Sequence, residues 1–166
     1  MSSGSSTTGS RSRLAVELGK KNAFEMREQE AYLNLVRTVS VLSRDFAVLF
    51  KSFGVSETQY NALRIIAGAG KKGIRMEMIG ERMVARDPDT TRLINRLLVA
   101  GYVLKERLED DRRCSVVCLT GEGRALLKRM RGKVDRLHAE QLGHMKASDL
   151  DQLNRLLVTA RERAEE

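Results

Sequence analysis

Apolar side chains recur at helical spacing over much of this chain, and the longest such stretch covers residues 27–53. Side chains three and four positions apart lie on one face of a helix, so the pattern predicts a long amphipathic helix. Gly54 follows it and is typical of a residue just past a helix end. The expected apolar face consists of Tyr32, Leu35, Val36, Val39, Leu42, Phe46, Leu49 and Phe50.

Two shorter helices are predicted next. Ser56 and Gln59 have the spacing of a capping box, which satisfies the first free amides of a helix. That helix is expected to end at residues 68–70, and another is expected over residues 74–83. The inward positions would be Tyr60, Leu63, Ile66 and Ala67 in the first helix and Met76, Ile79 and Met83 in the second.

A further helix is predicted to run to Ala100, with Asp87 as its N-cap and Pro88 in its first turn. Its apolar side holds Ile94, Leu97 and Leu98. Residues 102–107 and 114–119 read as two strands around a charged turn at residues 108–113, which predicts a β-hairpin.

Two more amphipathic helices follow, one from about residue 121 to residue 145 and one capped by Ser148. The fold class is therefore mainly α with a small β-hairpin (α+β). The terminal helices have apolar stripes but little globular body to bury them in, so we expect them to form a helical dimerisation layer. Those stripes are Leu127, Met130, Val134, Leu137 and Gln141, then Leu150, Leu153, Leu157 and Ala160.

A short helix, a tight link and a second helix form the helix-turn-helix plan, in which the second helix enters the DNA major groove. Arg92 and Arg96 are four positions apart and share the polar side of that helix, where Arg can read guanine. The hairpin that follows would be a wing with Arg112 and Arg113 at its tip. The polar side as a whole offers Thr90, Thr91, Arg92, Asn95 and Arg96.

Charge supports a nucleic-acid partner. The net charge is +8, and residues 71–133 contain 16 Lys and Arg against 9 Asp and Glu. Such a localised excess is the electrostatic footprint expected for double-stranded DNA, although a solvated basic face would give the same count. Acidic residues 109–111 at the hairpin tip, together with Asp87 and Asp89, should oppose phosphate.

Several classes are disfavoured by what the chain contains. No apolar run reaches the roughly 18 residues that span a bilayer, so we expect no membrane and a cytoplasmic protein. Residues 1–20 begin with Ser, Thr and Gly and are expected to be a disordered leader. Catalytic motifs and metal-ligand spacings are not found, so we expect no enzyme, no metal and no cofactor. Cys114 and Cys118 would lie about 13 Å apart on one strand, too far for a disulfide between them.

The stretch 55–127 resembles the MarR (multiple antibiotic resistance regulator) family of bacterial winged helix-turn-helix repressors. The residues that carry the resemblance are Gln59 and Leu63, the run 89–97, the run 101–103, then the Asp-Arg-Arg of residues 111–113 and the Leu-Thr-Gly-Glu-Gly of residues 119–123.

The resemblance implies one domain over residues 21–166. Residues 55–123 would be the winged lobe, and residues 21–53 and 124–166 would be the dimerisation helices. A symmetric homodimer would then bind a near-palindromic operator as a repressor. Many relatives are released from DNA by a phenolic or other aromatic anion, so such an effector is expected as well.

The resemblance also assigns roles to residues. Thr91 would contact phosphate, Thr90 and Arg92 would contact bases or phosphate, and Arg96 would do so or brace the lobe. Arg112 and Arg113 would be wing residues, with Asp111 positioning one of them. Two alternatives stay open: a weakly specific architectural DNA binder, and a redox-responsive regulator that uses Cys114 or Cys118. Because Cys is often only a small buried apolar residue, the second alternative is disfavoured.

Overall fold

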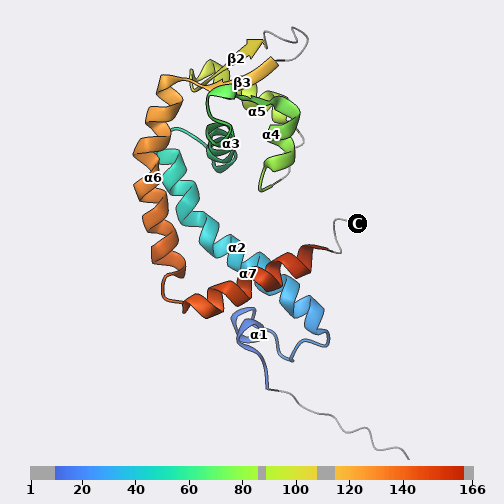
Figure 1. Ribbon diagram of the computed structural model, residues 1–166. Coiled ribbons are helices and arrows are strands. Elements are labelled where there is room, and N and C mark those ends of the chain that lie inside the picture. The colour runs from blue at the N-terminus through green and yellow to red at the C-terminus, as the bar shows by residue number, and fades with distance from the viewer. Residues whose placement is uncertain (1–9, 86–88, 108–114, 163–166) are drawn as a thin grey trace, which may run out of the picture. The chain divides into compact units, whose positions relative to one another are not determined.

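The computed structural model describes all residues except 1–9, 86–88, 108–114 and 163–166 (Figure 1). The chain divides into two compact units, residues 1–44 and 45–166, and each is described by itself. Helix α2 runs through the boundary between them. In chain order the elements are α1 (Arg13–Glu17), α2 (Arg27–Ser52), α3 (Glu57–Gly68), a 3-10 turn η1 (Gly70–Lys72), β1 (Ile74–Arg75), α4 (Met76–Arg82), α5 (Thr90–Val99), β2 (Val103–Arg107), β3 (Ser115–Leu119), α6 (Gly121–Leu142) and α7 (Ala147–Glu162).

Helix α1 falls within residues 1–20, where a disordered leader was expected. The Ser12 side chain accepts a hydrogen bond from the Ala15 amide and so caps the helix. Leu14 and Ala15 are buried. The expectation of disorder is therefore wrong for Arg13–Glu17, which form a capped helix that buries two apolar side chains. Residues 1–9 lie outside the described part of the chain.

The second unit contains a three-stranded antiparallel sheet in the order β1-β3-β2. Strands β2 and β3 form the expected hairpin, with Val103 opposite Leu119. Strand β1 was not expected, since residues 74–83 were assigned wholly to a helix. Ile74 instead pairs with Val117 and Arg75 with Val116, so the helix begins only at Met76. Two residues are too few for a period-2 pattern, and their partners lie far along the chain.

One hydrophobic core joins the sheet to the surrounding helices. The capping box at the start of α3 is present, because the Ser56 hydroxyl accepts from the Gln59 amide while the Gln59 side chain accepts from the Ser56 amide. This capping box sets where α3 begins. From that start, Leu63 and Ile66 face the core. The largest fully buried side chains come from five elements: Leu63, Ile66, Ile79, Ile94, Leu97, Val117, Leu126 and Met130.

Helix α6 approaches the backbone after α5 very closely at Gly123. A Cβ atom built on Gly123 would collide with the carbonyl oxygen of Tyr102, which is backbone and cannot rotate away. Thr120 caps the helix by accepting from the Gly123 amide, and its own hydroxyl donates to the Gly101 carbonyl at 2.7 Å. The first turn of α6 is thereby held against the residues that connect α5 to the hairpin.

We expect Gly123→Ala to lower the free energy of unfolding by about 2–3 kcal/mol, since the added methyl overpacks a rigid contact. Gly121→Ala is the matched control, because a Cβ there meets nothing within 4 Å. Chemical denaturation of both variants measures the difference. Equal stability of the two would show that α6 does not approach Tyr102 as described.

Two helices leave apolar side chains uncovered in the single chain. No residue of α7 is buried, and Leu153, Leu156 and Val158 are 36%, 59% and 48% exposed. In α2 only Phe50 is buried. The exposed apolar residues of α2 are Tyr32, Leu35, Val36, Val39, Val41 and Val48.

Candidate nucleic-acid interface

Helix α5 has one side in the core and the other in solvent. Leu93, Ile94 and Leu97 are buried beneath it. Its start is set by Asp89, whose carboxylate accepts from the Arg92 amide at 2.8 Å. The expected N-cap at Asp87 was therefore wrong by two residues, because Asp89 is the carboxylate that reaches the free amide. The negative charge of Asp89 therefore lies beside the free amides at the start of α5.

The outer side of α5 exposes four of the five residues expected there, namely Thr91, Arg92, Asn95 and Arg96. Thr90 is half-buried instead. Its hydroxyl oxygen would lie 2.9 Å from a Cβ built on Gly80, so a larger residue at this point of α4 would force the Thr90 side chain to shift. The Thr91 hydroxyl donates to the sulfur of Met76 at 3.5 Å. The threonines thus hold α5 against α4, and the two arginines and Asn95 face outward.

Arg92 and Arg96 also line a small cleft between the starts of α3 and α5. Its volume is about 220 Å³, and its other walls are Ser56, Thr58, Asp89 and Leu93. Sequence reasoning assigned Ser56 only to capping and did not single out Thr58. The capping box of the sequence located the start of α3. That this start lies beside α5 depends on tertiary packing. The cleft brings two guanidinium groups next to hydroxyl groups, a combination suited to phosphate oxygens.

The expected wing residues Asp111, Arg112 and Arg113 lie outside the described residues, as does Cys114. The strands that lead to the tip are described, and their last pair is Arg107 opposite Ser115. Figure 1 shows this hairpin rising beyond α4 and α5.

Among the described residues, no three His, Cys, Asp or Glu side chains gather as they would around a metal ion. None of the described helices combines the length and the apolarity needed to cross a bilayer.

Comparison with known proteins identifies the lobe. The MarR family profile matches residues 55–115. A crystal structure of a MarR transcription factor from Planctomyces limnophilus is 38% identical and covers 82% of this chain and 98% of its own, with a TM-score of 0.62. The chain belongs to the MarR family. It is a winged helix-turn-helix transcription regulator, and α4 and α5 are its helix-turn-helix (Figure 1).

Two other relatives of this MarR regulator are more distant. The HTH-type transcriptional regulator PapX of Escherichia coli is 22% identical over 67% of this chain and 68% of its own. The crystal structure of CouR from Rhodococcus jostii RHA1 bound to p-coumaroyl-CoA is 18% identical, covers 84% of this chain and 96% of its own, and has a TM-score of 0.71. The second likeness shows the shared fold.

Cys118 of this MarR regulator is a buried free thiol on β3. Burial raises its pKa above the ordinary value, and the neighbouring Glu106 carboxylate raises it further by charge and by accepting the thiol hydrogen at 3.7 Å. A raised pKa keeps the thiol protonated near neutral pH. Because oxidants and alkylating agents react with the thiolate, a protonated thiol makes Cys118 less reactive toward them.

We therefore expect iodoacetamide at pH 8 to label Cys118 at least about tenfold more slowly in the folded protein than in urea, because the thiolate fraction and access are both reduced. A Cys114→Ser background isolates the signal, which mass spectrometry follows with time. Labelling at the rate of the unfolded chain would contradict the assignment and would reopen a redox role for Cys118.

Proposed function

We propose that this protein is a sequence-specific repressor that binds a near-palindromic operator as a homodimer and is released by a small-molecule effector. The observation that carries the proposal is the two-sided α5: its apolar side is buried in the lobe, while Arg92, Asn95 and Arg96 project outward beside the α3 cleft. A helix anchored by one buried side can present the side chains of its other side to base edges. Action on genomic DNA would place the protein in the cytoplasm.

The exposed residues divide into base readers and backbone contacts in this proposal. Arg92 and Asn95 would reach base edges, since Arg pairs with guanine and Asn with adenine in the major groove. Arg96, with Ser56 and Thr58 across the cleft, would hold a phosphate. Thr91 would contact backbone, and Thr90 would position α5 from its half-buried place. Arg112 and Arg113 would act from the wing, with Asp111 bracing one of them.

The homodimer would cover the apolar side chains that the single chain exposes. α7 buries none of its residues, and α2 exposes six large apolar ones. Helices with such stripes reach stability by packing against a partner, and a second copy supplies an identical stripe through a two-fold axis. Two lobes related by that axis would read two inverted half-sites.

Release by a small molecule is supported by analogy alone. The structure of CouR, which shares the fold, contains p-coumaroyl-CoA. A phenolic or other aromatic effector is accordingly the proposed class for this chain. The architectural alternative lacks a positive observation of its own, and the raised pKa of Cys118 speaks against that residue as the redox switch.

Identification of the operator tests this proposal. Genomic fragments that the purified protein retains at moderate salt are sequenced and then footprinted. Protection should cover two inverted half-sites about 10 bp apart, centre to centre. A single half-site protected at full affinity would overturn the symmetric dimer, and retention of random fragments would favour the architectural binder.

A further inference from the structure

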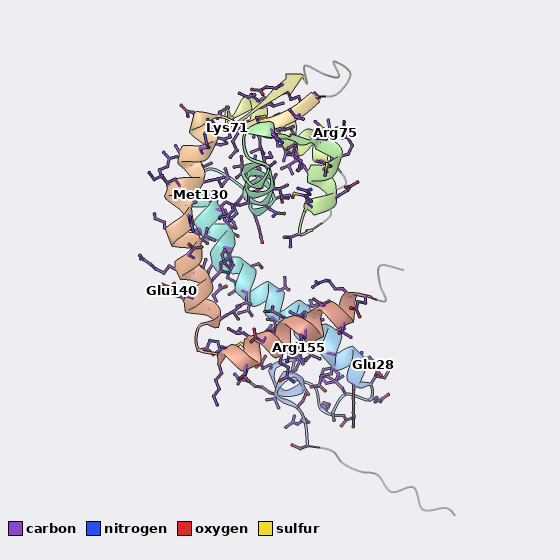
Figure 2. The ribbon with its side chains drawn as sticks, viewed as in Figure 1. Glu28, Lys71, Arg75, Met130, Glu140 and Arg155 are labelled. Atoms are coloured by element: carbon purple, nitrogen blue, oxygen red, sulfur yellow. The ribbon has the colours of Figure 1, made fainter. Side chains whose placement is uncertain are left out.

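One side of α3 faces α5 and the segment that leads to it. Helix α3 packs against both α4 and α5, and Arg75 marks where α4 begins (Figure 2). The connecting segment starts at Met83, which caps the end of α4, and ends at Asp89, which caps the start of α5. Thr58 of α3 lines the cleft beside α5. Asn61 lies on the same side of α3, because residues three positions apart share a helix face.

The Asn61 side chain makes a long-range hydrogen bond to this connecting segment. Its carbonyl oxygen, Oδ1, accepts from the backbone amide of Val84 at 2.9 Å, across 23 positions of the chain. Val84 follows the cap of α4 directly and is 91% exposed, so packing of its own side chain does not hold it in place. The hydrogen bond therefore supplies a fixed point for the segment as it leaves α4.

Both ends of this hydrogen bond are anchored in the core. Asn61 is half-buried and is followed directly by Ala62 and Leu63, which are fully buried. Met83, immediately before Val84, is buried as well. Because an exposed amide can donate to water instead, loss of the bond should change overall stability little. Its effect should lie mainly in the placement of the segment.

We propose that Asn61 is a positioning residue for DNA recognition, which holds Val84 and thereby fixes where α5 begins. Asp89, which accepts from the Arg92 amide at 2.8 Å, follows Val84 by only a few positions. A displaced α5 would misplace Arg92 and Asn95 against base edges, because base recognition depends on hydrogen-bond geometry. Attraction to phosphate would persist. The consequence for specificity rests on the proposed function, whereas the positioning of α5 does not.

Hydrogen exchange followed by NMR tests the positioning without DNA. Asn61→Leu keeps the size of the side chain but removes the acceptor, and Asn61→Asp restores an acceptor oxygen at the same place. In Asn61→Leu we expect the Val84 amide to exchange at least about tenfold faster than in the unmodified protein, and the Arg92 amide at least about threefold faster, because the start of α5 becomes more mobile. Asn61→Asp should return both rates to those of the unmodified protein.

Two results would overturn the positioning. Exchange of the Val84 amide at the rate of an unstructured chain in the unmodified protein would show that the hydrogen bond does not hold the segment. Faster exchange of Val84 in Asn61→Leu, with Arg92 unchanged, would show that the segment does not position α5.

DNA binding of the same variants tests the consequence for specificity. Asn61→Leu should lower the ratio of operator affinity to random-DNA affinity about threefold to tenfold and leave the salt dependence of random-DNA binding unchanged, because base contacts are misplaced while phosphate contacts remain. Asn61→Asp should keep the ratio, since its added charge acts on both kinds of DNA alike. Asn22→Leu, the same substitution at an exposed position outside the lobe, should keep it as well.

The outcomes separate this proposal from the proposed function. If both affinities fall in proportion in Asn61→Leu and the unfolding temperature falls with them, Asn61 serves stability alone and the proposal is wrong. If the unmodified protein does not distinguish operator from random DNA, the proposed repressor is wrong, and the exchange rates decide whether Asn61 positions α5. If the unmodified protein and Asn61→Leu distinguish them equally well, the proposed function stands and the role of Asn61 in specificity is wrong.

Discussion

Replacing Arg92 by alanine is expected to weaken operator binding by about 30-fold to 10⁴-fold. One lost arginine–base contact costs on the order of 1–3 kcal/mol, and a symmetric dimer loses it at both half-sites. Arg92 is exposed on α5 and makes no ion pair among the described residues, so its removal should leave the lobe folded. Fluorescence anisotropy with operator and random DNA measures both affinity and base preference.

Arg136→Ala is the matched control, because it removes the same exposed charge from α6, away from the helix-turn-helix. It should change operator binding by less than about threefold, as expected for one distant screened charge. If Arg92→Ala lowers operator affinity no more than Arg136→Ala does, α5 is not reading bases. The same conclusion follows if Arg92→Ala lowers the affinity for random DNA as much as the affinity for the operator.

Leu156→Asp is expected to raise the dimer dissociation constant by about 10³-fold or more. The change places a charge in an apolar seam, and two-fold symmetry introduces it twice. We therefore expect the free energy of dimerisation to become less favourable by about 4 kcal/mol in total. Leu156 is 59% exposed in the single chain, so the monomer should fold normally. Light scattering at micromolar concentration should move from about twice 18.7 kDa towards that mass.

Asn154→Asp is the control for this change. It adds the same charge two positions away on α7, at an exposed site that is already polar. It should assemble as the unmodified chain does. If Leu156→Asp remains dimeric, the exposed stripe of α7 does not form the interface. If the unmodified chain is monomeric at high concentration, the homodimer itself is wrong.

Sequence reasoning succeeded where the determining contacts are local. The capping box of Ser56 and Gln59 and the buried face of α5 depend on residues a few positions apart, and the β2–β3 hairpin pairs two consecutive segments of the chain. Periodicity located the helices of the helix-turn-helix and separated Leu97 in the core from Arg96 in solvent.

It was less successful where distant segments meet. Strand β1 exists because Ile74 pairs with Val117, and a two-residue segment carries no pattern of its own. Thr90 looks like an exposed helix residue until the packing of α4 places Gly80 beside it. The place of Thr58 beside α5 and the hydrogen bond of Asn61 to Val84 likewise result from tertiary packing, so neither the composition nor the spacing of the residues indicated them.

The central claim is that α5 reads base sequence, and the ratio of operator affinity to random-DNA affinity tests it most directly. Both affinities are measured for the unmodified protein in one buffer at physiological salt, since the phosphate contribution depends on salt. The account predicts a ratio of about 10³ or more. A ratio within about tenfold, typical of charge-driven binding alone, would contradict it.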